Sequence, residues 1–406
     1  MCVNYKNVNV FKLIQKTDKK SHYDWVLLGA VAILVLSGLA FLASVLSVSG
    51  AADFQRDFVK QVLFGVVFGS VIAFVLSLVD YHFLLKHSRS FLFLNIGLLA
   101  FLAVFSLSAI ISKNSVSSLI SPLANLPVRP SAANGSLRWI DIGVRGFSVS
   151  FQPSEAAKLV LLIYFGSFIQ LFDHKKGVSF WDLKKPIYSF IVCAVLIFLQ
   201  PDLGTVLIIF TILLSALWVS RVSIKILAPL IIIVAITTFF LIANTDYRKA
   251  RVQALNDGNS AVLFQVTQVK RAIQNGGLWG KGYGNSEFKK AKLIPFASTD
   301  AIIGVIGEEI GFVWTTAFLS LYLVVFWRGV KISREAPDLG GKALAIGIVV
   351  WIVSQAFLNL AGITGLVPLK GLPLPFVSGG GTALALNIIS IGILLNISSH
   401  KLDKHS

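Results

Sequence analysis

The stretch WVLLGAVAILVLSGLAFLASVLSV, from Trp25 to Val48, runs for 24 residues without a charged side chain. A hydrocarbon core of about 30 Å is crossed by roughly 20 helical residues, so this stretch is long enough to span a bilayer. Over the whole chain of 406 residues, 55% are hydrophobic, 14% are charged, and the mean hydropathy is +0.79. The composition therefore indicates an integral membrane protein.

Apolar stretches of similar length recur along most of the chain, and we expect ten transmembrane helices. Their predicted ranges are 25–48, 58–80, 91–112, 154–172, 187–199, 203–220, 224–243, 301–327, 343–366 and 376–397. The predicted fold class is an all-α integral membrane protein with two long extracytoplasmic loops, at about 113–152 and 244–299. We expect a ten-helix domain at 25–398, a cytoplasmic N-terminal tail at 1–24 and a cytoplasmic C-terminal tail at 399–406.

The basic residues predict the orientation, because Lys and Arg in short loops stay on the cytoplasmic side. The basic residues of the two tails are Lys12, Lys16, Lys19, Lys20, Lys401 and Lys404. An even number of spans puts both tails on one side, so we expect both termini to be cytoplasmic. The 244–299 loop is basic too, but long loops cross the membrane largely regardless of charge.

The net charge of +17 has two interpretations. Cytoplasmic Lys and Arg can simply meet anionic lipid headgroups. Alternatively, the external basic loops attract an anionic substrate such as a lipid-linked pyrophosphate. Nucleic acid is not an expected partner, because the chain has no soluble basic domain. Cys2 and Cys193 fall in the tail and in a span, so they predict neither a disulfide nor a metal cluster.

The first polar cluster is RWIDIGVRGFSVSFQPSEAAKL, which begins at Arg138 and ends at Leu159. Pro153 suits the first turn of a helix, and Glu155 and Lys158 share one face of it. In one interpretation the two charges neutralise each other so that the helix can enter lipid. In the other, Lys158 is a cation held near the outer surface for a phosphate.

The second cluster, LQPDLGT at 199–205, places Asp202 at a helix start, where a carboxylate commonly caps free backbone N–H groups. The third, FASTDAIIGVIGEEIGF at 296–312, contains three carboxylates. Asp300 can also cap a helix, but Glu308 and Glu309 cannot. In a straight helix they lie about 12 Å deeper in the membrane than Asp300. Such a pair must face a polar cavity, contact a cation or hold a proton.

The fourth cluster, GLVPLKGLPLPFVSGGGTALAL at 365–386, combines three prolines with Lys370 just before the last span. Pro368, Pro373 and Pro375 exclude a regular helix there, and irregular backbone at membrane depth needs protein or a cavity around it. The glycines at 379–381 fit close contact between helices or with a ligand. A tight loop explains the glycines well, but it explains Lys370 less easily.

These motifs together resemble the SEDS family (shape, elongation, division and sporulation), the bacterial peptidoglycan polymerases. RWIDIG with FQPSEAAKL, QPDLGT, GGLWGKGYGNS, STDAIIGVIGEEIGF and GLPLPFVSGGG occur in the family's order and at about its spacing. GYGNS and LKGLPLPF are more similar to the division branch, the FtsW type, and to its sporulation relatives than to the elongation branch.

The resemblance implies a glycosyltransferase that polymerises lipid II outside the cytoplasmic membrane, releases undecaprenyl pyrophosphate and acts in cell division. It implies that Asp300 is the catalytic base, and that Arg138, Lys158, Asp202 and Lys370 bind substrate. Glu155, Glu308 and Glu309 then form a supporting polar network. The implied partners are lipid II, the growing glycan strand, a class B penicillin-binding protein and divisome membrane proteins. No cofactor is expected, and a requirement for a divalent metal is left open.

The chain departs from the family pattern around the proposed base. The family usually has His and Phe where this chain has Ser298 and Ala301, and Tyr where it has Gly379. These changes keep the carboxylate but alter its neighbours. Two other functions stay open: a flippase for the same lipid-linked precursor, which also needs intramembrane charge and broken helices, and a catalytically silent scaffold for a transpeptidase.

Overall fold

The computed structural model describes residues 23–48, 50–112, 126–133, 136–144, 147–171, 183–219, 261–367 and 371–400, with isolated positions at 123, 228 and 232. The predictions for the seventh span at 224–243, for Lys370 and for most of both tails lie outside these residues.

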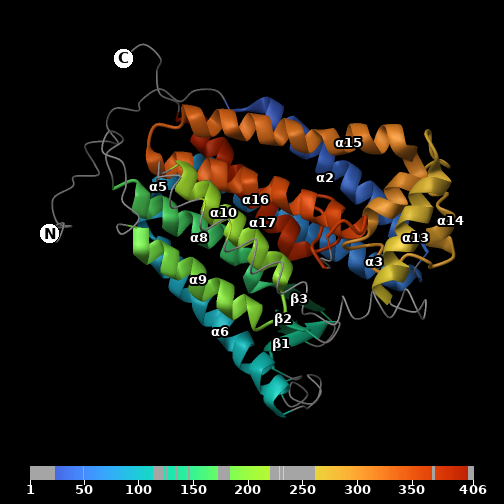
Figure 1. Ribbon diagram of the computed structural model, residues 1–406, viewed down its shortest axis with the longest axis horizontal. Helices are drawn as coiled ribbons and strands as arrows, with labels where there is room; N and C mark the ends of the chain where they lie inside the picture. Colours follow the sequence, from blue (N-terminus) through green and yellow to red (C-terminus); the bar gives the residue numbers. More distant parts are fainter. Residues whose placement is uncertain are drawn as a thin grey trace.

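Long helices lie side by side in one bundle (Figure 1). Their bounds are α2 Trp25–Leu46, α3 Ala51–Lys60, η1 Gln61–Phe68, α4 Gly69–Leu78, α5 Tyr81–Lys86, α6 Ser88–Ser112, α8 Pro153–Ile169, α9 Lys184–Phe198, α10 Leu203–Val219, α13 Ala261–Gly276, α14 Glu287–Lys290, α15 Ile302–Glu335, α16 Leu339–Ile363 and α17 Gly381–Ser399. The segment η1 is a π-helix that joins α3 and α4 into one continuous helix.

Six of the described helices are long and apolar enough to cross a membrane. They are α2, the combined α3–η1–α4 helix, α6, α15, α16 and α17. The shorter helices α8, α9 and α10 coincide with three further predicted spans. The chain is thus a mostly helical, multi-pass membrane protein, while the total of ten spans stays a prediction.

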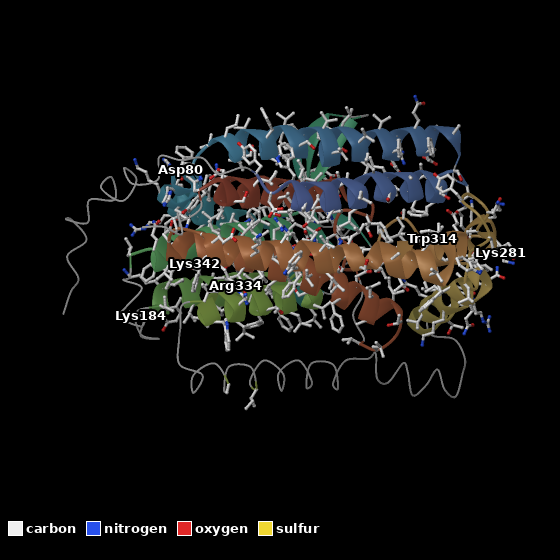
Figure 2. The ribbon with its side chains drawn as sticks, turned by 90° about the horizontal axis from the view of Figure 1, so that it is seen from above. Asp80, Lys184, Lys281, Trp314, Arg334 and Lys342 are labelled. Carbon is white, nitrogen blue, oxygen red and sulfur yellow. The ribbon has the colours of Figure 1, made fainter. Side chains whose placement is uncertain are left out.

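The bundle has two ends, which Figure 2 marks with labelled side chains. Lys184 and Lys342 lie at one end, here called the α5 end, and Lys281 and Trp314 lie at the opposite, α13 end. At the α5 end, Asp24 caps the start of α2 and accepts hydrogen bonds from Arg328 of α15 at 2.6–3.0 Å. This ion pair fixes α2 and α15 side by side.

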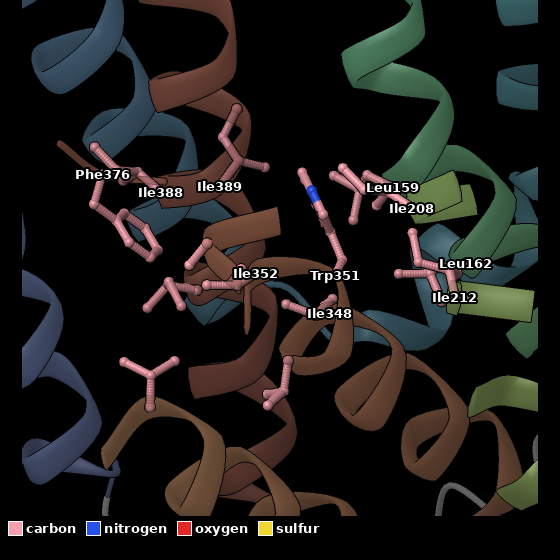
Figure 3. Packing of buried hydrophobic residues seen from close by; sticks show 14 of the residues in the cluster. Leu159, Leu162, Ile208, Ile212, Ile348, Trp351, Ile352, Phe376, Ile388 and Ile389 are labelled. Carbon is pink, nitrogen blue, oxygen red and sulfur yellow. The ribbon is translucent and has the colours of Figure 1, made fainter. Parts of the chain in front are cut away.

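The centre of the bundle is α16, which contacts α8, α10 and α15. Trp351 of α16 is fully buried between leucine and isoleucine side chains of α8 and α10 (Figure 3). The helices α4 and α17 approach so closely that a Cβ added to Gly392 would lie 2.3 Å from the carbonyl oxygen of Ala73. Small residues at such crossings allow close helix contact, which stabilises helix pairs in lipid.

The first predicted long loop contains an antiparallel sheet of three strands, ordered β1-β2-β3. The strands are β1 Val128–Ala133, β2 Ser136–Val144 and β3 Phe147–Phe151. The all-α prediction is therefore wrong for this segment. Apolar and polar residues alternate in FSVSF of β3, and a period of two is typical of a strand.

The helix α15 bends sharply at Gly311, where φ is 78° and ψ is 176°. An added Cβ at Gly311 would lie 2.3 Å from the backbone nitrogen of Gly280, so the loop after α13 lies directly against the bend. Residues 302–310 consequently form a short helical segment of their own beside α13.

This bend corrects the predicted depth of Glu308 and Glu309. Glu309 accepts a hydrogen bond from Ser44, two residues before the end of α2. The carbonyl of Asp300 accepts one from Asn359, four residues before the end of α16. Both positions therefore lie near the α13 end. The prediction that the glutamates lie about 12 Å deeper is wrong, because it assumed one straight helix.

Candidate active site

The 371–380 segment, which connects α16 to α17, is the centre of the candidate site. Its prolines keep it from being helical, so its backbone polar groups need partners elsewhere. Side chains from three parts of the bundle supply them: Gln355 and Asn359 of α16, Tyr322 of α15 and Gln61 of η1. The predicted irregular, protein-enclosed segment is confirmed.

Asp300 lies against the first residue of this segment. The N–H of Gly371 donates to Oδ2 of Asp300 at 3.1 Å, and the hydroxyl of Thr299 donates to Oδ1 at 3.3 Å. Asn359 donates to the carbonyl of Asp300 at 2.9 Å and to that of Leu372 at 2.7 Å. The α15 helix is capped one residue later, at Ala301. Only 8% of Asp300 is exposed, so its carboxylate is held in a defined place.

Arg138 of β2 also lies near Gly371. Its Nε donates to the carbonyl of Gln200 at 3.1 Å, and its Nη2 donates to that of Pro201. Its Nη1 is 4.0 Å from Oδ1 of Asp202, beyond hydrogen-bond distance. A Cβ added to Gly371 would lie 3.7 Å from the same Nη1 atom. The guanidinium and the Asp300 carboxylate thus flank one glycine.

Asp202 has the geometry of a helix cap. Its Oδ1 accepts from the backbone N–H of Thr205 at 3.2 Å, and its Oδ2 accepts from the Thr205 hydroxyl at 2.9 Å. The first of these bonds gives a partner to a free backbone N–H group at the start of α10, as the capping interpretation predicts. The carboxylate nevertheless faces Arg138, so it also holds the guanidinium beside the site.

Lys158 lies inside the bundle. Its Nζ donates to Oε1 of Glu155 at 2.7 Å and to Oε1 of Gln355 at 2.7 Å, and it is 4.8 Å from the ring centroid of Trp351. Its exposed fraction is 0%. This geometry favours the Glu155–Lys158 pair over a lysine that touches a phosphate at the surface.

Glu308 and Glu309 fasten the loop after α13. Glu308 accepts from Asn275 at 2.8 Å and from the hydroxyl of Ser286. Glu309 accepts from Nζ of Lys289 at 2.7 Å and from Ser44 at 2.6 Å. The pair therefore holds α13, α14 and α2 together, and neither carboxylate contacts Asp300 through any described hydrogen bond.

Three side-chain amides at the site were missing from the sequence prediction. Gln61, Gln355 and Asn359 are each at most 5% exposed, and each bonds the 371–380 segment. The sequence does contain a signal for these three residues, because an uncharged polar amide inside an apolar span also needs a hydrogen-bond partner. Charged groups stand out more strongly in such spans, and the predicted site residues were charged ones.

Residues 24–403 match the family described as cell cycle protein, FTSW_RODA_SPOVE. The chain belongs to the FtsW/RodA/SpoVE family. This confirms the resemblance to the SEDS polymerases.

Relatives within the FtsW/RodA/SpoVE family cover most of the chain. It is 33% identical over 282 residues to the probable peptidoglycan glycosyltransferase FtsW of Haemophilus ducreyi, covering 68% of this chain and 70% of that protein. It is 31% identical over 392 residues to stage V sporulation protein E of Bacillus subtilis, covering 95% of this chain and 99% of that protein.

Solved structures of the family share the fold. A chain of a peptidoglycan synthase complex, from a study of polymerization and crosslinking, aligns with a TM-score of 0.69 at 24% identity and covers 93% of this chain and 97% of that one. RodA of Thermus thermophilus aligns with a TM-score of 0.62 at 22% identity and covers 94% and 98%.

Proposed function

We propose that this FtsW-type protein is a peptidoglycan glycosyltransferase that polymerises lipid II into glycan strands in cell division. The observation that carries the proposal is the place of Asp300, a buried carboxylate that accepts a hydrogen bond from Gly371, with the Arg138 guanidinium near the same glycine. The relatives named probable peptidoglycan glycosyltransferase FtsW support the activity.

The proposed reaction needs a base and a cation side by side. The acceptor sugar hydroxyl gives its proton to Asp300 as its oxygen attacks the anomeric carbon of the donor. The bond between that carbon and the pyrophosphate oxygen breaks, and undecaprenyl pyrophosphate leaves with the electron pair. Negative charge grows on the leaving group, and the guanidinium of Arg138, whose Nη1 lies near Gly371, stabilises that charge.

The other residues of the site support this geometry in the proposal. Asp202 and the carbonyls of Gln200 and Pro201 orient the guanidinium, while Glu155, Lys158 and Gln355 hold α8 against α16. Lys370 is proposed as a second cation for the pyrophosphate, and it lies outside the described residues.

The proposed location is the bacterial cytoplasmic membrane, at the division septum, with the α13 end outside and both termini in the cytoplasm. The proposed crosslinking partner is a class B penicillin-binding protein, in line with the polymerization and crosslinking complex that shares the fold. Exposed Trp279 and Trp314 at the α13 end suit a membrane interface.

Purified protein in detergent, without sealed membranes, tests the activity. A polymerase converts lipid II into glycan strands under these conditions. A flippase moves labelled lipid II only in vesicles, and a silent scaffold does neither. Absence of glycan strands from well-folded protein with its transpeptidase partner present would contradict the proposal.

A further inference from the structure

Gln61 is the first residue of the π-helical segment η1, and its side chain is directed into the bundle. It is 5% exposed, although most residues of α3 and η1 around it are exposed or half-buried. A π-helix is rare and often marks a functional position. A buried amide in such a segment needs partners for both its donor and its acceptor.

Both ends of the Gln61 amide bond the 371–380 segment. Oε1 accepts from the backbone N–H of Gly380 at 2.9 Å, and Nε2 donates to the carbonyl of Ser378 at 3.3 Å. One side chain thus fixes the two residues that flank Gly379.

Gly379 connects the Gln61 hydrogen bonds to the turn before the candidate base. Its N–H donates to the carbonyl of Ser298 at 2.7 Å, and Ser298 is two residues before Asp300. A Cβ added to Gly379 would lie 2.7 Å from that same carbonyl oxygen, so only glycine allows the approach. The backbone around Asp300 is therefore held from one side by Gln61 through Gly379, and from the other by Asn359.

We propose that Gln61 is a positioning residue for Asp300: its amide fixes residues 378–380, which in turn fix Ser298 and the carboxylate that follows. Both side-chain hydrogen bonds of Gln61 go to backbone atoms of the 371–380 segment, so in this proposal it acts through the backbone. The inference rests on the proposed role of Asp300 as the base.

The test replaces Gln61 with a side chain of similar length that forms no such hydrogen bonds. For Gln61→Met we expect kcat for glycan synthesis in detergent to fall about tenfold, the scale of one or two lost hydrogen bonds. The KM for lipid II should stay within about twofold, because the loss affects the reacting geometry rather than uniform binding. Gln55→Met, an exposed glutamine of α3, is the matched control and should leave kcat unchanged.

A double-mutant cycle separates positioning from general loosening of the fold. When Gln61→Met is added to Asp300→Asn, the residual rate should fall less than about twofold, because the base that Gln61 positions is already lost. A further tenfold fall would overturn the inference. If Gln61→Met does not fold, Gln61→Glu keeps the acceptor for Gly380 and should give an intermediate kcat; an unchanged kcat would overturn it.

The two proposals fail in different ways. Full activity of Gln61→Met beside an inactive Asp300→Asn contradicts only the role of Gln61. Near-normal activity of Asp300→Asn contradicts the proposed base itself.

Discussion

The backbone N–H of Gly371 donates a hydrogen bond to Oδ2 of Asp300, across 71 positions of sequence. The same glycine has a φ of 77°, a left-handed conformation that other residues adopt at a cost. A Cβ added to this glycine would lie 3.7 Å from Nη1 of Arg138. The segment between α16 and α17 thus brings the candidate base and the candidate phosphate-binding cation to one glycine.

Orientation can be tested at two exposed lysines from opposite ends of the bundle, Lys281 and Lys184 (Figure 2). Lys281→Cys should react with an impermeant thiol reagent added to intact cells, and Lys184→Cys should react only after lysis. Both variants need a Cys2→Ser background, because Cys2 lies in the tail predicted to be cytoplasmic and would also react after lysis, whereas native Cys193 is buried and should not react. The reverse pattern would exclude an external site at the α13 end.

The Glu155–Lys158 pair is fully buried, so losing one partner leaves an uncompensated charge. Lys158→Met should lower the free energy of unfolding by about 3–5 kcal/mol. The double variant Glu155→Gln with Lys158→Met should recover most of it, because no lone charge remains. Thermal unfolding and lipid II binding measure both effects. A stable double variant that no longer binds lipid II would show that Lys158 contacts substrate instead.

The bend in α15 depends on the absence of a side chain at Gly311. Gly311→Ala should cost more than about 2 kcal/mol, because it adds a clash with Gly280 to the cost of a left-handed residue. Gly277 also has a positive φ, 58°, but an added Cβ there meets nothing within 4 Å. Gly277→Ala should therefore cost only about 1–2 kcal/mol. Equal losses for the two variants, measured by denaturant unfolding, would speak against the bend.

His82 at the α5 end makes stability depend on pH. Burial lowers its pKa, but its hydrogen bonds to Asp338 and Asp80 raise it more, giving a pKa of about 9. The ring is thus protonated when folded, with nitrogens 2.6 Å from Asp80 and 3.2 Å from Asp338. Because the folded pKa exceeds the unfolded value of 6.5, this stabilisation is complete below pH 6.5 and is lost as the pH rises through 9.

The melting temperature in detergent should therefore fall by roughly a few degrees between pH 6.5 and pH 10. His82→Gln should remove the part of this dependence that comes from the imidazole. If the melting temperature of His82→Gln falls between pH 6.5 and pH 10 as steeply as that of the wild type, the ion pairs of His82 do not cause the pH dependence.

The sequence predicted the helices well where they are long and apolar. Residues 25–48 and 343–366 correspond to α2 and α16, because the bilayer alone requires about 20 consecutive apolar residues. The sheet at 128–151 was not predicted, although apolar and polar residues alternate in FSVSF of β3. The bend at Gly311 could not be predicted, since glycine is frequent inside membrane helices. Only the positive φ of Gly311, where the chain lies against Gly280, distinguishes it from the other glycines of the helix.

The residues of the site were easier to predict than their contacts. Asp300 and Asp202 were selected as polar groups at helix starts and Arg138 from the family resemblance, and the structure places all three around Gly371 and the start of α10. Lys158 was selected as a charged residue near the start of a span. Its partner Gln355 is 197 positions away, so the burial of Lys158 could not be predicted from the residues around it in the sequence. The need of Asn359 for a partner could have been predicted from its place in an apolar span, but the partner itself, Asp300, is 59 positions away and could not.

The central claim is that the Asp300 carboxylate takes the proton in glycosyl transfer. Asp300→Asn keeps one oxygen that can accept from the N–H of Gly371, and its NH2 group can donate to the hydroxyl oxygen of Thr299, so the fold should be preserved, but an amide cannot act as a base near neutral pH. With purified protein and lipid II in detergent, the rate of glycan synthesis should fall by about two to four orders of magnitude while the melting temperature changes little. A well-folded Asp300→Asn protein that makes glycan strands at a near-normal rate would contradict the account and direct the search for the base to Asp202.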